Sequence, residues 1–142
     1  MTDNRVLVDE EGNEAVFVNR SDGYAVARLK EQGYLQVIIS TEKNMVVEAR
    51  ARKLGIEVIY GVEDKGKTLL EYCKGKGIDP SEVMFIGNDA NDLLAFEVAG
   101  MTGAPADAEK EVFNMAYWKS SRKGGYGVIR ELYNHFNMTL IG

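Results

Sequence analysis

Apolar and polar positions follow three successive patterns along the first part of the chain. In residues 5–19, apolar side chains alternate with polar ones on either side of a glycine-containing turn at residues 10–13, which predicts a β-hairpin. Apolar residues at helical spacing then predict a helix that Asp22 can cap and that Gly33 ends. The apolar, β-branched run at residues 35–39 is too short for a helix, so we expect a buried parallel strand there.

The rest of the chain repeats an alternation of helix and strand. Expected helices occupy residues 43–54, 66–75 and 91–99, and each leads into an expected strand, at residues 57–60, 83–86 and 101–104. A short helix after residue 107, a short strand at residues 117–118 and a last helix at residues 127–136 complete the chain. Strands separated by single helices form parallel sheets that are covered on both faces. The pattern therefore predicts a single three-layer α/β domain over residues 1–142.

Length, charge and composition narrow the class of protein. The 142 residues carry 17 basic and 22 acidic side chains, a net charge of 17 − 22 = −5, which argues against nucleic acid or an anionic membrane as the main partner. No apolar run approaches the ~20 residues of a membrane span, and the first residues hold no hydrophobic signal core, so we expect a cytoplasmic protein. The lone Cys73 excludes a disulfide framework. We expect Cys73, Tyr117 and Trp118 to pack in the core.

Polar residues follow three of the expected strands directly. Ser40 and Thr41 follow the first of them, Lys65 ends the loop after the next, and the acidic, amide-rich loop at residues 87–92 follows the third. The carboxyl ends of parallel strands meet at one edge of a sheet, where ligands bind. We therefore expect these three segments to lie together.

The types of these residues suggest a phosphate and a magnesium ion. Asp89 and Asp92, with Asn88 as a further candidate ligand, offer the hard oxygens that Mg²⁺ prefers, and Mg²⁺ in turn implies a phosphate-bearing partner. Ser40 can donate a hydrogen bond to a phosphoryl oxygen, and Lys65 can neutralise its charge. Taken singly, each has a simpler interpretation: Asn91 or Asp92 can cap the helix that follows, the serine can end a strand, and the lysine can be solvated.

A second candidate segment lies near the end of the chain. Residues 113–129 contain no Asp or Glu, whereas Arg122, Lys123, Gly124 and Gly125 stand next to one another within them. A basic, glycine-rich loop that leads into a helix can cradle an anion with its backbone N–H groups. A surface turn is the alternative interpretation.

Four segments, in this order, resemble motifs of the haloacid dehalogenase superfamily. They are VIIST at residues 37–41, GVEDK at 61–65, FIGNDANDL at 85–93 and KGGYGVIREL at 123–132. Within that superfamily, the chain is similar to the cap-less 3-deoxy-octulosonate 8-phosphate phosphatases and to the phosphatase-like domain fused behind acylneuraminate cytidylyltransferases. The resemblance spans nearly the whole chain and implies a Rossmann-like fold without a cap domain, preceded by the hairpin.

The resemblance also implies roles for individual residues. Ser40 is implied as the phosphate-binding hydroxyl, Lys65 as the catalytic lysine that holds nucleophile and phosphate together, and Asp89 with Asp92 as the acidic loop near Mg²⁺. In that branch the hairpin builds a tetramer interface, and the glycine-rich tail reaches into a neighbouring subunit's active site. A homotetramer that acts on a phosphorylated sugar acid is therefore implied.

The first motif of the superfamily is an exception to the match. That motif is an apolar strand ending in Asp-x-Asp-Gly-x-x-Thr-Asp, in which the first Asp is the nucleophile and the second is the general acid/base. Thr2 and Asp3 match only its end. We therefore expect an N-terminally shortened chain that lacks the central strand and is inactive as it stands. Asn88 replaces the Asp that the phosphatases usually carry, which predicts weaker Mg²⁺ binding.

Two hypotheses for the function follow. The first is a Mg²⁺-dependent phosphatase that acts on a 2-keto-3-deoxy sugar acid phosphate of the sialic acid or octulosonate type. The second is a non-catalytic oligomerising or regulatory module associated with a cytidylyltransferase, which the missing nucleophile and Asn88 favour. A third hypothesis, a phosphoacceptor or nucleotide pocket of the flavodoxin-like kind, needs an acidic cluster at the first strand that this chain lacks.

Overall fold

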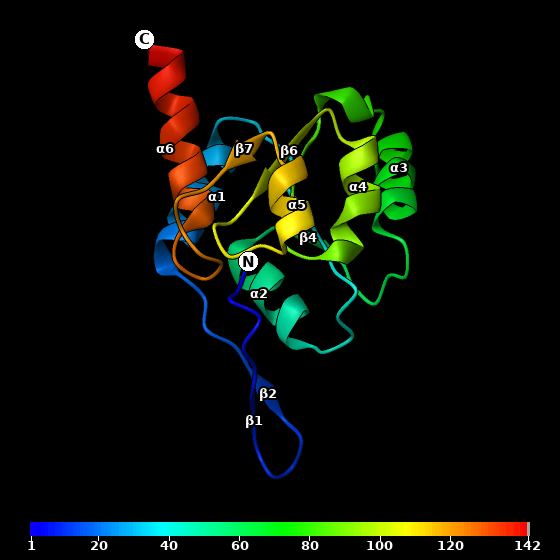
Figure 1. Cartoon of the computed structure of the whole chain (residues 1–142), viewed down its shortest axis with the longest axis vertical. Coiled ribbons are helices and arrows are strands. Elements are labelled where there is room, and N and C mark those ends of the chain that lie inside the picture. Colours follow the sequence, from blue (N-terminus) through cyan, green and yellow to red (C-terminus); the bar gives the residue numbers. More distant parts are fainter. Residues whose placement is uncertain (142) are drawn as a thin grey trace.

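The computed structural model describes the backbone of residues 1–141 and the side chains of residues 1–137. After two short N-terminal strands, helices alternate with single strands (Figure 1), as the hydrophobic pattern predicts. The helices are α1 (Arg20–Glu31), α2 (Val46–Leu54), α3 (Lys65–Lys76), α4 (Leu93–Val98), α5 (Lys110–Met115) and α6 (Val128–Ile141), with 3-10 turns at Pro80–Glu82 and Ala90–Asp92. The strands are β1 (Leu7–Val8), β2 (Glu14–Ala15), β3 (Val37–Ile39), β4 (Glu57–Ile59), β5 (Met84–Ile86), β6 (Met101–Ala104) and β7 (Trp118–Lys119).

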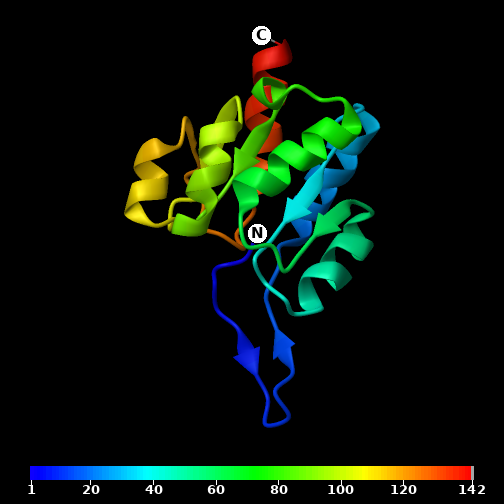
Figure 2. The same ribbon diagram turned by 90° about the vertical axis from the view of Figure 1, so that its right-hand side faces the viewer.

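The strands after the hairpin all run parallel to the strands with which they pair. β3 pairs with β4, so that Ile39 lies beside Ile59. β5, β6 and β7 pair in that order, with Ile86 of β5 beside Gly103 of β6. β3 and β5 do not pair with each other, so the described residues form two parallel half-sheets (Figure 2). The parallel strand arrangement that the sequence predicts is confirmed.

Helices cover both faces of these strands. α3 packs against α4 on one side, and α1 packs against α6 on the other (Figures 1 and 2). Gly66 lets α3 approach α4 closely, because a Cβ atom at this position would lie 2.6 Å from the carbonyl oxygen of Leu94. The predicted three-layer arrangement is therefore observed. Within the part of the chain that the structure describes, no helix has the length and apolar character needed to cross a membrane.

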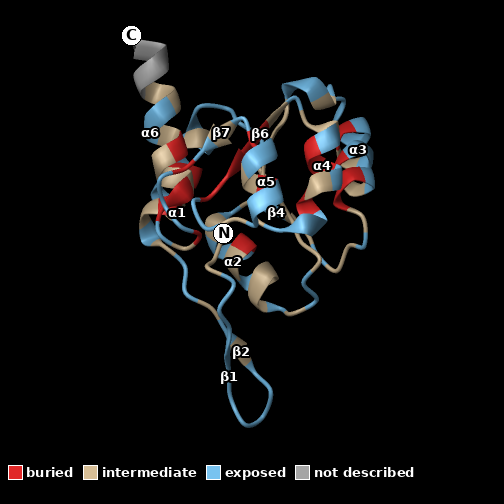
Figure 3. Ribbon diagram, viewed as in Figure 1, coloured by how far each residue is buried: buried red, intermediate tan, exposed pale blue. Residues whose placement is uncertain are grey.

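Two clusters of the apolar core meet at β5. Their buried members are Leu69, Cys73 and Ala95 in one cluster and Phe96, Ala104, Val112 and Ala116 in the other. Phe85 of β5 packs against both clusters, and Figure 3 shows buried positions on α3, α4 and β6. Cys73 is buried, as predicted. Because burying one large apolar side chain contributes about 1.5–3 kcal/mol, these clusters hold α3, α4 and α5 against the strands.

The N-terminal hairpin projects away from the rest of the molecule (Figure 1). β1 and β2 pair antiparallel, with Leu7 beside Ala15, which confirms the hairpin predicted for residues 5–19. The turn passes through Gly12, whose φ of +84° lies in the left-handed region that glycine adopts without strain. Leu7 and Phe17 are 69% and 77% exposed, so the hairpin presents apolar side chains to solvent.

The predicted cap of the first helix is wrong. Asn19, not Asp22, caps α1, because the Asn19 side chain accepts a hydrogen bond from the Ser21 amide at 2.9 Å. Asp22 is instead buried in the first turn of α1, where its carboxylate accepts the backbone N–H of Arg130 at 3.0 Å. An acidic side chain therefore stabilises the start of α6 from another helix, which a local sequence pattern does not reveal.

The expectation that Tyr117 lies in the core is also wrong. Tyr117 is 81% exposed, whereas its neighbour Trp118 is partly buried in β7. β7 is an outer strand that pairs only with β6 in the described sheet. Successive side chains of an extended segment point in opposite directions, so one of two adjacent aromatic residues faces solvent here.

Candidate functional site

The three polar segments singled out in the sequence lie where three strands end. β3 runs into Ser40 and Thr41, β4 into the loop that ends at Lys65, and β5 into residues 87–92. The Lys65 Nζ donates a hydrogen bond to Asn91 Oδ1 at 3.0 Å, and Asn91 Nδ2 donates to Thr41 Oγ1 at 3.2 Å. The structure therefore brings a hydroxyl, the lysine and the acidic loop together.

Lys65 is a buried cation at the first position of α3. Asp64 caps this helix by accepting the Lys67 amide at 2.9 Å, and the helix therefore starts at Lys65. The Lys65 Nζ lies 2.6 Å from Asp92 Oδ1, and the two side chains are only 10% and 3% exposed. A charge removed from water to this extent persists only with a charged and hydrogen-bonded partner. Asp92 and Asn91 supply these partners.

Asp92 also closes the acidic loop on itself. Its Oδ2 accepts the backbone N–H of Asn88 at 2.8 Å and that of Asp89 at 3.1 Å. Gly87 makes this possible, because a Cβ atom on Gly87 would lie 2.4 Å from the Asp92 Cβ. Both carboxylate oxygens of Asp92 are thus engaged, one by the lysine and one by the backbone.

Asp89 lies in a different environment from Asp92. It is exposed, and its Oδ1 accepts the Ala90 amide at 2.7 Å, at the start of the 3-10 turn. Next to it, the Asn88 Nδ2 donates to Asn4 Oδ1 at 3.1 Å. Among the residues that the structure describes, no three His, Cys, Asp or Glu side chains gather as a metal site. Mg²⁺ is often held by one or two carboxylates, with waters and substrate phosphate, so the donors present fit a magnesium site built around Asp89.

The two hydroxyl residues after β3 make different contacts. The Ser40 Oγ accepts the Glu42 amide at 3.1 Å, so the hydroxyl hydrogen of Ser40 is not used in that bond. The Ser40 N–H donates to the Ile59 carbonyl at 2.9 Å, which continues the ladder between β3 and β4. Thr41, rather than Ser40, is hydrogen-bonded to the lysine-bearing network through Asn91. Ser40 keeps a hydroxyl that can donate to a ligand.

The glycine-rich segment packs on the first residues of the chain. Gly124 is buried so closely that a Cβ atom would lie 2.1 Å from the Thr2 carbonyl oxygen, and its N–H donates to Asp107 Oδ1 at 2.8 Å. Gly125 has a φ of +79°, in the left-handed region. Glycine is therefore required at both positions, at the first by the close contact and at the second by the backbone conformation.

This loop and the acidic loop contact the same N-terminal segment. Gly124 lies against Thr2, and two residues later Asn4 accepts its hydrogen bond from Asn88. Arg122 and Lys123 are exposed, and neither forms an ion pair with a described residue. The loop that carries these two side chains therefore contacts the same N-terminal segment as the acidic loop, while the Arg122 Nη1 donates to the Gly127 carbonyl at 3.4 Å.

Glu131, which the sequence analysis does not single out, lies beneath the same loop. From the first turn of α6 its carboxylate accepts hydrogen bonds from the hydroxyls of Ser120 and Ser121 and, at 3.0 Å, from the Ser121 amide. Burial alone would raise the pKa of Glu131, but these hydrogen bonds and the charge of Arg122 outweigh it and hold the pKa below its ordinary value. The carboxylate is therefore ionised at neutral pH.

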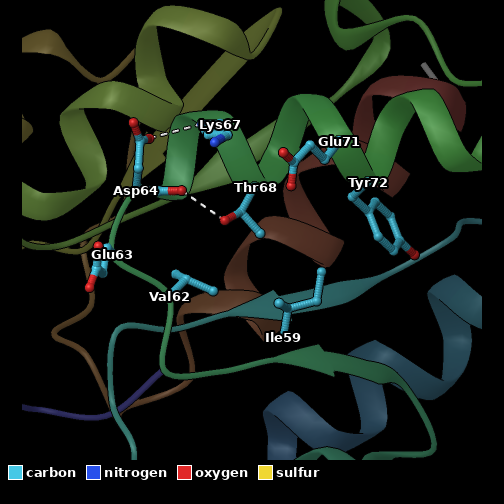
Figure 4. A pocket seen from close by; sticks show the side chains of 8 residues that line it. All are labelled: Ile59, Val62, Glu63, Asp64, Lys67, Thr68, Glu71 and Tyr72. Atoms are coloured by element: carbon cyan, nitrogen blue, oxygen red, sulfur yellow. Dashed lines mark hydrogen bonds between the residues drawn. The ribbon is translucent and has the colours of Figure 1, made fainter.

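Two surface hollows lie outside the candidate site. One, of about 550 Å³, is formed by β4, the loop after it and α3 (Figure 4), and its lining residues are Ile59, Val62, Glu63, Asp64, Lys67, Thr68, Glu71 and Tyr72. The other, of about 630 Å³, lies between the hairpin turn and the start of α2. Neither contains a residue of the candidate site. Lys67 follows Lys65 by two positions and therefore projects from the opposite side of α3.

Comparison with known proteins identifies the family of this chain. The chain matches the haloacid dehalogenase-like hydrolase family over residues 35–132, more than half of its length. The chain therefore belongs to the haloacid dehalogenase-like hydrolases.

Relatives of this chain include phosphatases and cytidylyltransferases. The 3-deoxy-D-manno-octulosonate 8-phosphate phosphatase of Yersinia pestis is 30% identical over 133 residues, which cover 93% of this chain and 71% of the relative. The N-acylneuraminate cytidylyltransferase of Oncorhynchus mykiss is 30% identical over 139 residues, 95% of this chain. The chain spans only about a third (32%) of that cytidylyltransferase.

Two solved structures show the same architecture. A proposed HAD family hydrolase from Streptomyces avermitilis is 44% identical, with a TM-score of 0.90 over 92% of this chain and 75% of the other. The 3-deoxy-D-manno-octulosonate 8-phosphate phosphatase of Moraxella catarrhalis, solved with magnesium, phosphate and KDO, is 28% identical, with a TM-score of 0.89 over 99% of this chain and 85% of the other. The chain is thus similar to these two proteins in both sequence and fold.

Proposed function

We propose that the site around Lys65 binds the phosphoryl group of a 2-keto-3-deoxy sugar acid phosphate of the sialic acid or octulosonate type. The observation that carries the proposal is the buried Lys65 ammonium, held by Asp92 and Asn91 where three parallel strands end. A fixed positive charge in a water-poor site stabilises charge that develops on a phosphoryl oxygen. Ser40 and Thr41 add hydroxyl groups at the same edge of the sheet.

Magnesium is the cofactor that we propose for this site. Asp89 is the exposed carboxylate, Asn88 contributes an amide oxygen, and Asp92 holds the loop that carries both. When bound, Mg²⁺ would orient the phosphate and neutralise part of its charge. The replacement of a carboxylate by Asn88 removes one negative charge, so we expect weaker Mg²⁺ binding than in a loop with three aspartates.

The basic glycine-rich loop is proposed to bind the anionic end of the substrate. Arg122 and Lys123 are exposed and form no ion pair with a described residue, while Gly124 and Gly125 let the backbone bend closely around the N-terminal segment. Exposed cationic side chains on a loop of fixed backbone conformation favour a carboxylate or phosphate ligand.

Hydrolysis needs a nucleophile that these 142 residues do not include. They contain no Asp-x-Asp pair, and β3 and β5 lie in separate half-sheets. We propose that a further parallel strand between β3 and β5, ending in Asp-x-Asp, completes both the sheet and the catalytic site. Its first carboxylate would take the phosphoryl group, and the second would move the proton. The 142 residues alone should therefore release no phosphate.

An extended variant tests this proposal. An apolar strand of about five residues ending in Asp-x-Asp-Gly-x is joined in front of Met1, and phosphate release from the eight- and nine-carbon sugar acid phosphates is measured with and without Mg²⁺. We expect Mg²⁺-dependent release, on the order of 10⁴-fold faster than from a control in which the first Asp of the added strand is Asn. A folded extended protein that releases no phosphate from either substrate would contradict the proposed function.

The hairpin favours a second function. In this proposal the chain is a non-catalytic oligomerising or regulatory module associated with a cytidylyltransferase. Leu7, Val8 and Phe17 are exposed apolar residues on an element that projects from the rest of the molecule. Apolar patches of this kind mark interaction sites. We propose that four hairpins associate in a homotetramer, which would suit either function.

Removal of the apolar side chains from the hairpin should dissociate the assembly. In the variant Leu7→Ser, Val8→Ser, Phe17→Ser, we expect a monomer in sedimentation velocity where the unaltered chain sediments as a tetramer, because the lost apolar area drives the association. The far-ultraviolet circular dichroism of the α/β body should not change. An unaltered chain that is monomeric at high concentration would contradict the proposed homotetramer.

A further inference from the structure

The loop at residues 120–127 is held by two carboxylates, Glu131 of α6 and Asp107, which accepts the Gly124 amide at 2.8 Å. Glu131 accepts hydrogen bonds from both serine hydroxyls that open the loop and from the Ser121 amide. Ser120 is buried, and its Oγ in turn accepts the Arg122 amide at 3.0 Å. The Glu131 N–H donates to the Gly127 carbonyl at 3.0 Å, so Glu131 contacts both ends of the loop.

Glu131 organises the loop without pairing directly with its cations. The hydrogen-bond donors to its carboxylate are serine hydroxyls and a backbone amide, and no ion pair within 4.0 Å joins Glu131 to Arg122 or Lys123. Hydrogen bonds to an ionised acceptor are stronger than neutral ones, so the carboxylate can fix a loop that has no regular structure. The Arg122 Nη1 donates to the Gly127 carbonyl at 3.4 Å, and neither Arg122 nor Lys123 forms an ion pair with a described residue.

The far side of the same loop reaches the candidate site. Gly124 lies against Thr2, and Asn4 of the same segment accepts a hydrogen bond from Asn88 of the acidic loop. A shift of the loop on the Glu131 side would therefore move Arg122 and Lys123 relative to that site. Small displacements of binding groups are costly because the geometry of the contact is lost.

We propose that Glu131 is the positioning residue of the anion-binding loop: it holds Arg122 and Lys123 in place for the anionic part of the ligand. This inference rests on the proposed function, which assigns anion binding to the loop. Glu131 does not touch the ligand itself. Glu131 acts on the loop through its hydrogen bonds with Ser120 and Ser121. Loss of these bonds should lower the affinity for the ligand while the rest of the fold stays unchanged.

Phosphate titrations of matched variants test the inference. Inorganic phosphate is added to the 142-residue chain, and binding is followed through the amide NMR signals of Gly124 and Gly125. We expect Glu131→Ala to weaken phosphate binding about tenfold, because the charge-assisted hydrogen bonds are lost. Glu131→Gln should weaken it less, because one acceptor oxygen remains. Glu111→Gln, at an exposed glutamate in the first turn of α5, should bind like the unaltered chain.

Each outcome of the titration supports or overturns the inference. Weakened binding with amide signals outside residues 120–127 unchanged supports it. If the unaltered chain binds phosphate and both Glu131 variants bind equally well, the positioning role is overturned while the proposed anion binding stands. If the unaltered chain shows no phosphate-dependent shift in the loop, the proposed anion binding fails, and the inference fails with it. Ser121→Ala, which removes one donor to Glu131, replaces Glu131→Ala if that variant does not fold.

Discussion

Replacement of Asp92 by Ala should lower the free energy of unfolding by about 3–5 kcal/mol, the range expected when one partner of a buried ion pair is removed. The Lys65 ammonium would remain buried with only the Asn91 carbonyl oxygen as a hydrogen-bond acceptor. The amides of Asn88 and Asp89 would also lose their acceptor. Urea denaturation followed by circular dichroism measures this change in the 142-residue chain.

Two controls distinguish the loss of the buried ion pair from a general sensitivity of the acidic loop to substitution. Asp89→Ala, at the exposed aspartate of the same loop, should cost only about 1 kcal/mol, as for the loss of a capping side chain. The double variant Lys65→Met, Asp92→Ala should be more stable than the sum of the two single effects predicts, because no unpaired ammonium remains. Strictly additive effects would show that Lys65 and Asp92 are not energetically coupled.

The order of helices and strands could be predicted because it depends on local periodicity. The run at residues 35–39 is apolar at nearly every position and contains β3, and the alternation after it gives parallel strands. Parallel topology in turn places the segments after β3, β4 and β5 at one edge. That is why Thr41, Lys65 and Asn91, separated by up to 50 residues, could be expected to meet.

The partners within the site could not be predicted in the same way. Asp89 and Asp92 are equivalent by residue type, yet one is exposed and the other buried against Lys65. The difference arises from the tight loop that Gly87 permits, in which Asp92 folds back onto the backbone. Such a difference depends on three-dimensional loop geometry, which hydrophobic periodicity does not encode.

Contacts between distant segments could not be predicted either, because they too depend on the three-dimensional arrangement of the chain. Asp22 has the residue type of a helix cap, but it lies inside the first turn of α1 and accepts the amide of Arg130, 108 residues away. Glu131 follows directly after the acid-free basic segment, and the hydrophobic pattern gives no sign that its carboxylate binds Ser120 and Ser121. Carboxylates that follow a glycine-rich loop in the sequence should therefore be tested as residues that hold the loop in place.

Replacement of Lys65 by Met in the extended, Asp-x-Asp-bearing variant should reduce kcat/KM by about 10²–10³-fold, the effect of losing one preorganised charge or donor aimed at a developing oxyanion. Methionine has a similar length and suits a buried position, so the loss would report on charge rather than on a cavity. The measurement is phosphate release at saturating Mg²⁺. The fall should appear in kcat as well as in kcat/KM, because the ammonium acts most strongly on the charge of the transition state.

Lys67 provides the matched control for this result. It lies on the same helix two positions later, at the hollow beside β4, and makes no contact with Asn91 or Asp92. Lys67→Met removes the same charge from α3, so any long-range effect of helix charge on the site should appear in both variants. A specific role for Lys65 predicts that Lys67→Met keeps kcat/KM within about twofold, whereas equal losses would trace the effect to the net charge of the helix rather than to the ammonium beside Asp92.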